Sequence, residues 1–242
     1  MSIIKVTLFQ KNIKQDINRD QKVKLISQKS DFLVFPEYFP LTGRWTEKNP
    51  IENSKIYIDR LLEVSEYYKG VIIGGSVFRE FNGEIYNSCP IIKDLSLIDW
   101  YDKKKVKDNS GSLKLSPGKS EGIFILSGVR FGVCLGDDIR DESILQSFQD
   151  EKVEIIFNPC SIGMVSNEEE SYAEDLKTFP ELSGKFSLNL VRVCSLGDIF
   201  SSRLTGRSLY SSASGIKWKV APFENQTEII KTLSITLSGK IS

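Results

Sequence analysis

The stretch DFLVFPE, residues 31–37, combines four apolar residues with an abrupt stop. Residues 32–35 form the kind of short apolar run that is typical of a buried strand. Pro36 ends that strand, because proline has no amide hydrogen to donate to a strand pair. Glu37 therefore follows directly after a buried strand, and the sequence predicts a carboxylate at the strand's end.

Two later segments carry polar residues at the ends of predicted strands. Residues 96–101 read as a strand, and Asp102 and Lys103 follow it. Residues 130–135 read as another strand, and Gly136-Asp137-Asp138 follows that one. The sequence thus offers a carboxylate, an ammonium and a glycine elbow at three strand ends.

The chain contains no histidine. That absence excludes Ser-His-Asp and Cys-His catalysis, zinc sites of the HExxH type and imidazole general bases. Acid and base chemistry in this protein must depend on carboxylates, lysine, tyrosine or a thiol. A glutamate–lysine system is one of the few hydrolytic arrangements that remain.

Length and charge narrow the class of protein. At 242 residues the chain is long enough for one α/β domain with a sizeable core, and we expect a single domain over residues 1–242. It has 32 basic and 32 acidic residues. A nucleic-acid or anionic-membrane partner usually requires a basic excess, so we expect neither partner.

The four cysteines are Cys89, Cys134, Cys160 and Cys194. They are widely spaced, no two form a CxxC pair, and most lie in apolar runs, so we expect buried free thiols in a reducing compartment. The first residues lack a signal-peptide pattern, and no apolar stretch approaches the roughly 18 residues of a membrane span. We therefore expect a soluble, cytoplasmic protein.

The rest of the chain alternates predicted helices and strands. Helices alternating with strands, followed by antiparallel strand pairs, indicate an α/β architecture with helices outside packed sheets. We predict strands at 3–9, 32–35, 71–78, 86–92, 96–101, 122–126, 130–135, 153–159 and 188–196, with further strands in the last forty or so residues, and helices at 13–30, 54–69, 141–149 and 168–178.

In their order and spacing, the three strand-end segments that carry Glu37, Lys103 and Gly136 resemble those of the nitrilase (carbon-nitrogen hydrolase) superfamily. The resemblance rests on Phe35-Pro36-Glu37, Tyr101-Asp102-Lys103 and the run ending at Asp138. It is supported by Tyr86-Asn87-Ser88, Ser116-Pro117-Gly118 and Gly206-Arg207-Ser208, which look like family turns and strand starts. It covers nearly the whole chain and implies a four-layer αββα sandwich that commonly dimerises, so we expect a homodimer.

The resemblance also implies roles for the site residues. Glu37 would be the general base, and Lys103 would stabilise an oxyanion and hold the pKa of Glu37 in a useful range. Matching Asp138 to the family's aspartate puts Gly136 where the family has its cysteine nucleophile. A hydrogen atom cannot attack a carbonyl, so the covalent step has no nucleophile at this position. A family glutamate after the lysine is also missing, since residues 107–116 contain none.

Two functions remain open from the sequence. The first is a protein with a degenerate Glu37/Lys103/Gly136 site, a pseudoenzyme that binds a small amide or carboxylate, or acts as an assembly partner, without covalent turnover. The second is a working amidase that uses Cys160, or a water activated by Glu37, on a small linear amide. Cys134 lies too far back along its strand to serve as the nucleophile.

Three further expectations concern the surroundings of this site. Asp138 orients the elbow through hydrogen bonds, while Asp137 faces the pocket. Cys160, just past the next strand, lies near the pocket rim. Two adjacent carboxylates on a strand end point in opposite directions, so we expect no metal and no cofactor.

Overall fold

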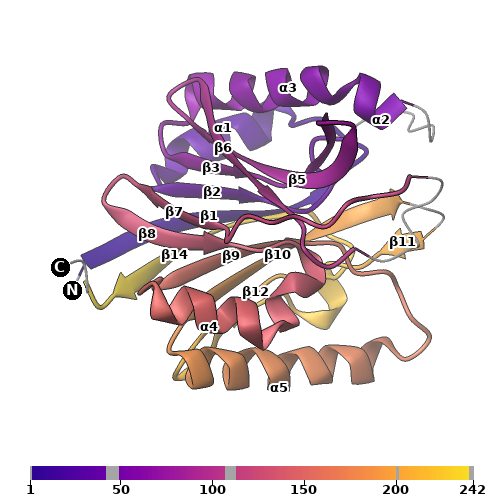
Figure 1. Ribbon diagram of the computed structural model, residues 1–242. Helices are drawn as coiled ribbons and strands as arrows, with labels where there is room; N and C mark the ends of the chain where they lie inside the picture. The colour runs from indigo at the N-terminus through magenta and orange to yellow at the C-terminus, as the bar shows by residue number, and fades with distance from the viewer. Residues whose placement is uncertain (1, 42–48, 107–112, 200–201, 240–242) are drawn as a thin grey trace.

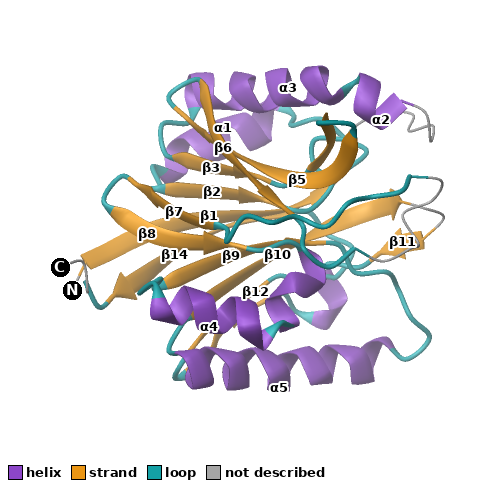
Figure 2. Ribbon diagram, in the orientation of Figure 1, coloured by secondary structure: helices purple, strands orange, loops and turns teal. Residues whose placement is uncertain are grey.

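The computed structural model describes residues 2–41, 49–106, 113–199 and 202–239. The strands form one large curled sheet whose two halves pack against each other between outer helices (Figures 1 and 2). Helices α1 (Arg19–Gln28) and α3 (Ser54–Tyr67) cover one half. Helices α4 (Glu142–Asp150) and α5 (Glu168–Phe186) cover the other. The layers are therefore helix, sheet, sheet and helix, as the resemblance implies.

The first half of the sheet has the order β4-β5-β3-β2-β1, with β14 on β1 and β6 on β5. The neighbours β1, β2 and β3 are parallel, whereas β5 is antiparallel to β3, β4 and β6. The strands are β1 (Ser2–Asn12), β2 (Phe32–Phe35), β3 (Val71–Gly74), β4 (Val77–Phe81), β5 (Glu84–Lys93), β6 (Ser96–Asp102) and β14 (Ile229–Leu237).

The second half has the order β10-β9-β8-β7, and β1 joins it to the first half by pairing with β10. Strands β8, β9 and β10 are parallel, so their carboxyl ends lie at one edge. The strands are β7 (Ile123–Leu126), β8 (Val129–Val133), β9 (Ile155–Cys160), β10 (Asn189–Ile199), β11 (Ser202–Leu204), β12 (Leu209–Ser212) and β13 (Gly215–Lys219). Short helical segments are α2 (Asn49–Glu52), η1 (Gly136–Arg140) and η2 (Pro222–Glu224).

Aromatic packing joins the two halves of the sheet. Phe32 of β2 lies with its ring centroid 5.2 Å from that of Phe131 on β8 and 5.0 Å from that of Phe157 on β9. All three side chains are fully buried. Fully burying an aromatic side chain of this size contributes about 1.5–3 kcal/mol, so this contact stabilises the packing of β2 on β8 and β9. It also places the carboxyl ends of these three strands together.

The predicted strand 71–78 is wrong in one respect, because it is two strands, β3 and β4. Gly75 separates them with φ +69°, a left-handed conformation that favours glycine. A Cβ at this position would lie 2.3 Å from the carbonyl oxygen of Pro36. The break therefore lets the chain pass close behind the turn that carries Glu37.

Two predicted helices have different ends in the structure. α5 continues to Phe186 through Pro180, although proline cannot donate the hydrogen bond of its helix position. Phe179, Leu182 and Phe186 are buried, and that apolar burial offsets the missing bond. α1 begins only at Arg19, because Asn18 caps it and accepts a hydrogen bond from the Gln21 amide.

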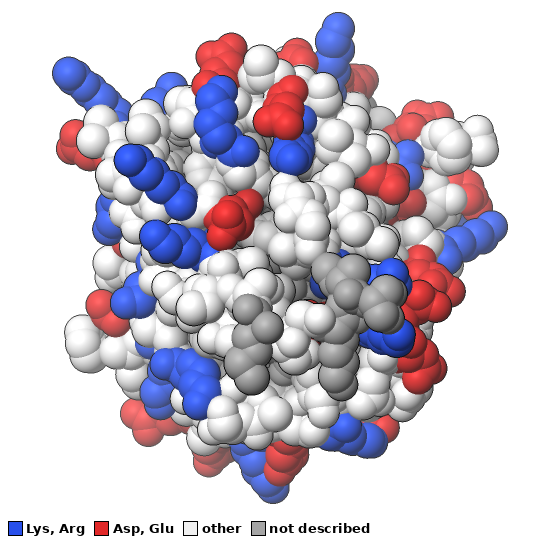
Figure 3. Space-filling view, turned by 90° about the vertical axis from the view of Figure 1, so that its left-hand side faces the viewer, with Lys and Arg blue, Asp and Glu red and all other residues white. Residues whose placement is uncertain are grey.

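All four cysteines are free and buried, which confirms the prediction for them. Basic and acidic side chains are interspersed on the face that Figure 3 shows. Within the described ranges, no helix is both long and apolar enough to cross a membrane.

Candidate functional site

Glu37 lies in the tight turn that follows β2. Its side chain is 0% exposed. The turn is closed by hydrogen bonds from the Phe39 amide to the Pro36 carbonyl and from the Leu41 amide to the Tyr38 carbonyl. The Tyr38 amide donates to Ser76 Oγ, which ties the turn to the break between β3 and β4. The carboxylate is therefore held at the strand end by a rigid backbone.

Lys103 is the first residue after β6. Its amide donates to the Asn87 carbonyl, and its carbonyl accepts from the Gly118 amide. The preceding residue, Asp102, accepts two hydrogen bonds from Arg79 Nη2 and one from Ser88 Oγ. These contacts fix the end of β6 and direct the Lys103 side chain toward Glu37.

Gly136 opens the elbow between β8 and α4 and has φ +51°. Asn158 of β9 donates through Nδ2 to the carbonyl oxygens of Gly136 and Cys134, at 3.1 and 3.0 Å. Asp138 joins the elbow to the lysine segment. Its side chain accepts from the Tyr101 hydroxyl at 2.7 Å and from the amides of Lys104 and Lys105 at 3.0 and 2.7 Å.

The structure brings Glu37, Lys103 and Gly136 together. Lys103 Nζ lies 2.7 Å from Glu37 Oε1. A Cβ built on Gly136 would lie 2.6 Å from Lys103 Nζ and 3.3 Å from Glu37 Oε2. A side chain at position 136 would therefore start beside both charged groups.

Three polar residues that sequence reasoning gave no role complete the site. Asn87 Nδ2 donates to Glu37 Oε1 at 2.9 Å. Ser161, just past β9, donates to Glu37 Oε2 through its amide at 3.0 Å and through Oγ at 2.9 Å. With Lys103, each carboxylate oxygen of Glu37 has two donors. Asn158 and Ser161 lie near and just beyond the end of β9, which was their only signal in the sequence, whereas Asn87 lies within β5 and belongs to the Tyr86-Asn87-Ser88 segment that supports the resemblance.

Burial and neighbouring charges both shift pKa values at this site. Burial favours the neutral form of Lys103, but the adjacent Glu37 carboxylate outweighs it, so the pKa of Lys103 is raised. Burial raises the pKa of Tyr38, and the charge of Glu37 raises it further. Burial also raises the pKa of Asp138, against the opposing hydrogen bonds from Lys104, Tyr101 and Lys105. Lys103 is thus a permanent cation at neutral pH.

Comparisons with known proteins support a single fold. No protein-family model matches the chain. The chain is 24% identical over 181 residues to a glutamine-dependent NAD(+) synthetase of Acinetobacter baylyi, with 70% of this chain and 32% of the relative covered. It is 26% identical over 173 residues to an omega-amidase of Xenopus tropicalis, covering 63% of this chain and 60% of the relative. The chain thus spans less than two thirds of the length of both relatives.

Solved structures match over more of the chain. A carbon-nitrogen hydrolase from Helicobacter pylori G27 superposes with a TM-score of 0.81 at 16% identity, covering 97% of this chain and 90% of the other. A cysteine-to-alanine variant of a Nesterenkonia sp. AN1 amidase, in complex with butyramide, superposes with a TM-score of 0.75 at 11% identity, covering 96% and 90%. The chain has the nitrilase-superfamily fold. The resemblance seen in the sequence and the predicted αββα sandwich are thereby confirmed.

Cys160 does not lie where we expected it in this nitrilase-superfamily fold. It is 2% exposed, and its Sγ lies 3.2 Å from Cys194 Sγ on the neighbouring strand. The following residue, Ser161, contacts Glu37 instead, because successive side chains of a strand point to opposite faces. The expectation that Cys160 reaches the pocket rim is wrong by one residue. Cys134 is also fully buried, behind Asn158.

The structure gives the place of Asp137 and of part of the segment that follows Lys103. Asp137 is half-buried at the start of η1, and its role stays a prediction. The segment without a glutamate falls partly on residues 107–112, which lie outside the described ranges. Among the described residues, no cluster of three or more acidic or cysteine side chains could hold a metal ion.

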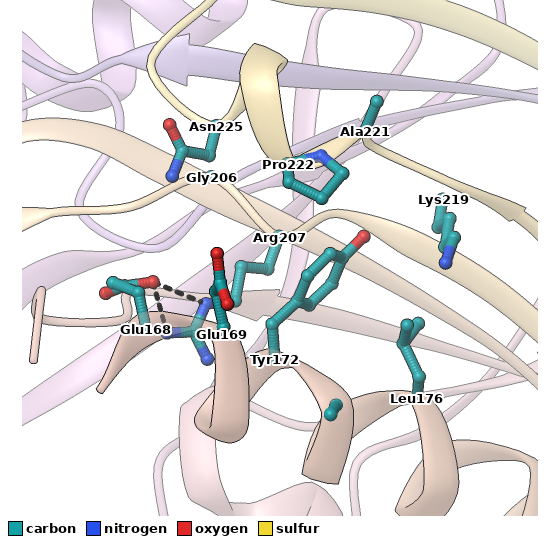
Figure 4. A pocket seen from close by; sticks show the side chains of 11 residues that line it. Glu168, Glu169, Tyr172, Leu176, Gly206, Arg207, Lys219, Ala221, Pro222 and Asn225 are labelled. Atoms are coloured by element: carbon teal, nitrogen blue, oxygen red, sulfur yellow. Dashed lines mark hydrogen bonds and ion pairs between the residues drawn. The ribbon is translucent and has the colours of Figure 1, made fainter.

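A separate cavity of about 400 Å³ opens beside the first turns of α5. Figure 4 shows Glu168 in direct contact with Arg207 on one side of it, with Tyr172 between Arg207 and Lys219. The residues that line it do not include Glu37, Lys103 or Gly136. This cavity is therefore distinct from the site formed by Glu37, Lys103 and Gly136.

Proposed function

We propose that this protein binds a small molecule carrying a carboxamide or a carboxylate at Glu37, Lys103 and Gly136, and that it does not hydrolyse the ligand. One observation carries the proposal. The Cβ direction of Gly136 points between Lys103 Nζ and Glu37 Oε2, at 2.6 and 3.3 Å, and glycine places only a hydrogen there. The position suits a nucleophile, and the chain has none at it.

The charges favour a ligand with an oxygen acceptor. Lys103 Nζ has three hydrogens, and the contact with Glu37 Oε1 uses one of them. The Lys103 side chain is 16% exposed, so a ligand can approach it. A carboxamide or carboxylate oxygen would accept from the remaining hydrogens. The Nesterenkonia amidase variant supports this ligand class, since it lacks a cysteine and its structure contains butyramide.

The absence of a nucleophile predicts very slow chemistry. In another hydrolase, removing the nucleophile alone lowered kcat roughly 10⁶-fold. We therefore place this protein among non-turnover members of the nitrilase-superfamily fold, a pseudoenzyme rather than an amidase.

A second candidate, an active amidase, is favoured by one contact. Ser161 Oγ lies 2.9 Å from Glu37 Oε2, which is within reach of a general base. Ser161, or a water activated by Glu37, would then replace the missing thiol. Cys160 is not part of this candidate, because its thiol is buried against Cys194.

Binding and turnover measured together test the proposal. The probes are butyramide and butyrate for calorimetric binding, and small aliphatic amides, ω-amides and N-carbamoyl amino acids for ammonia release. Lys103→Met should abolish binding, because the cation that meets the ligand oxygen is lost. Lys104→Met is the matched control on the next residue, and it should bind normally.

The outcomes separate the two candidates. Binding without ammonia release supports the non-turnover protein. Turnover near 1 s⁻¹ or above on any of these amides, which is ordinary for enzymes, would overturn it. Loss of that turnover in Ser161→Ala would then assign the nucleophile to Ser161, whereas loss only in Glu37→Gln would assign an activated water.

Three broader expectations are part of the same proposal. They are a single carbon-nitrogen hydrolase-like domain over residues 1–242, a homodimer and a reducing, cytoplasmic location. Light scattering on the purified protein tests the dimer, and a monomer at micromolar concentration would contradict it.

A further inference from the structure

Cys160 and Cys194 form a close pair of thiols at the ends of two parallel strands. They are directly paired in the register of β9 and β10, and their sulfur atoms are 3.2 Å apart. Neighbouring strands are about 4.8 Å apart. That spacing lies inside the range of roughly 4.4–6.8 Å between Cα atoms that a disulfide requires. The two thiols can therefore join without large backbone movement.

A buried arginine lies on the same face of the sheet as this pair. Arg192 is two residues before Cys194, and its Nη1 lies 2.8 Å from Asp175 Oδ2 on α5. Asp175 also forms ion pairs with Arg140 at 2.7 Å and with Arg207 at 3.4 Å. Arg207 also pairs with Glu168, whereas Arg192 Nε is buried without a hydrogen-bond partner. Arg192 therefore has an unused donor on the face that carries the two thiols.

The two thiols respond differently to these surroundings. Burial opposes ionisation of Cys194, but the hydrogen bond from Cys160 and the charge of Arg192 outweigh it, so the pKa of Cys194 is lowered. Burial raises the pKa of Cys160. Cys194 is thus the better nucleophile of the two, because the thiolate is the reactive form.

We propose that Cys160 and Cys194 are an oxidation site that a hydroperoxide converts into an intramolecular disulfide. The Cys194 thiolate attacks one peroxide oxygen, the O–O bond breaks, and the departing hydroxide takes up the proton that Cys194 released on ionising and becomes water. Cys194 is then a sulfenic acid. The Cys160 sulfur attacks the Cys194 sulfur, the S–S bond forms, and the sulfenic hydroxyl leaves with the Cys160 proton as a second water. Two thiols are oxidised, and one hydrogen peroxide is reduced to two waters.

The residues that follow the two cysteines contact Glu37. Ser161 follows Cys160 and donates to the Glu37 carboxylate. Ser195 follows Cys194 and donates to the backbone carbonyls of Glu37 and Cys160. The oxidation site is one residue away from both serines that hold Glu37. The inference does not depend on what the Glu37 site binds.

The experiment treats the purified, reduced protein with hydrogen peroxide, a reagent small enough for thiols that are 2% and 0% exposed. The protein is then denatured, alkylated with N-ethylmaleimide and digested with trypsin. The tryptic peptides 153–177 and 193–203 each hold one of the two cysteines. We expect these peptides to be joined, a mass loss of two hydrogens per chain, and alkylation of two thiols instead of four. Dithiothreitol should reverse all three changes.

Variants and controls make the result specific. Cys160→Ser and Cys194→Ser should each abolish the cross-link, whereas Cys89→Ala, another fully buried free thiol, should leave it unchanged. The wild-type digest is decisive even where a variant does not fold. Four alkylated thiols after peroxide treatment, irreversible oxygen adducts on either cysteine, or a cross-link through Cys89 or Cys134 would each overturn the proposal.

Discussion

Lys103 Nζ lies 2.7 Å from Glu37 Oε1, although the two residues are 66 positions apart in the chain. Each side chain follows a strand of the same half-sheet, and Gly136 reaches them from the other half. The ion pair therefore lies where the two halves of the sheet meet.

Gly136→Cys should create an unusually reactive thiol. The new Sγ would extend toward the Lys103 ammonium, which stabilises the thiolate and lowers the thiol's pKa. The 2.6 Å approach of Nζ to the new Cβ is relieved by movement of the flexible lysine end. We expect iodoacetamide to modify it about tenfold faster at pH 7 than an ordinary exposed thiol, the equivalent of a pKa about one unit lower.

Gly128→Cys is the matched control for that variant. Gly128 also has positive φ, +74°, and nothing lies within 4 Å of its Cβ position in the β7–β8 turn. Both variants place a cysteine at positive φ, and only position 136 lies beside charged groups, so the difference in their alkylation rates reports the charges at position 136. Equal rates, or a pH profile of Gly136→Cys that is not shifted to lower pH, would show that Gly136 is not at a nucleophile position.

Breaking the Glu37–Lys103 pair from one side should destabilise the protein. Lys103→Met leaves the buried Glu37 carboxylate without its cation, and such a loss costs about 3–5 kcal/mol of unfolding free energy. The double variant Glu37→Gln/Lys103→Met removes both charges and should lose less than the sum of the single variants. Urea unfolding followed by tryptophan fluorescence measures all three. Strict additivity would mean that the two side chains do not interact.

Asp138→Ala should lower the unfolding free energy, because it removes the hydrogen-bond acceptor that holds the elbow. The substitution leaves the Tyr101 hydroxyl and the amides of Lys104 and Lys105 without their acceptor. Each unsatisfied buried donor costs about 1–3 kcal/mol of unfolding free energy. Because water that enters the space would satisfy some of these donors, we expect a total loss of about 3 kcal/mol. Asp138→Asn keeps the shape and one acceptor, so its loss should be smaller. A loss below about 0.5 kcal/mol for Asp138→Ala would contradict the role of Asp138 as the anchor of the elbow.

Asp141 provides a pH-dependent test. It caps α4, and hydrogen bonds with Ser143 and the contact with Lys105 lower its pKa to about 2. The pKa in the unfolded chain is about 3.9. A folded-state pKa below the unfolded value means that the carboxylate stabilises the protein above about pH 4 and loses this effect as the pH falls toward 2.

The variant Asp141→Ala makes this contribution visible. At pH 7 it should lower the unfolding free energy by about 1 kcal/mol through loss of the cap. The difference from wild type should shrink between pH 4 and pH 2.5. A difference that stays constant over that interval would show that the charge of Asp141 does not contribute.

The sequence by itself determined the features that depend on neighbouring residues. The apolar run 32–35 followed by Pro36 predicts β2 with its observed bounds. Local hydrophobic pattern and proline chemistry are enough for this strand, because both act within a few residues. The order of Glu37, Lys103 and Gly136 after three strands carries the resemblance to the nitrilase superfamily, and it is the resemblance that implies the fold and a common site.

Only the tertiary structure decided which side chains meet at the strand ends. Ser161 donates to Glu37 from 124 residues away, whereas its neighbour Cys160 faces Cys194. One step along a strand reverses the face of a side chain, and the register of β9 against β10 sets that step. A long-range pairing of strands fixes this register, and no local pattern in the chain encodes it.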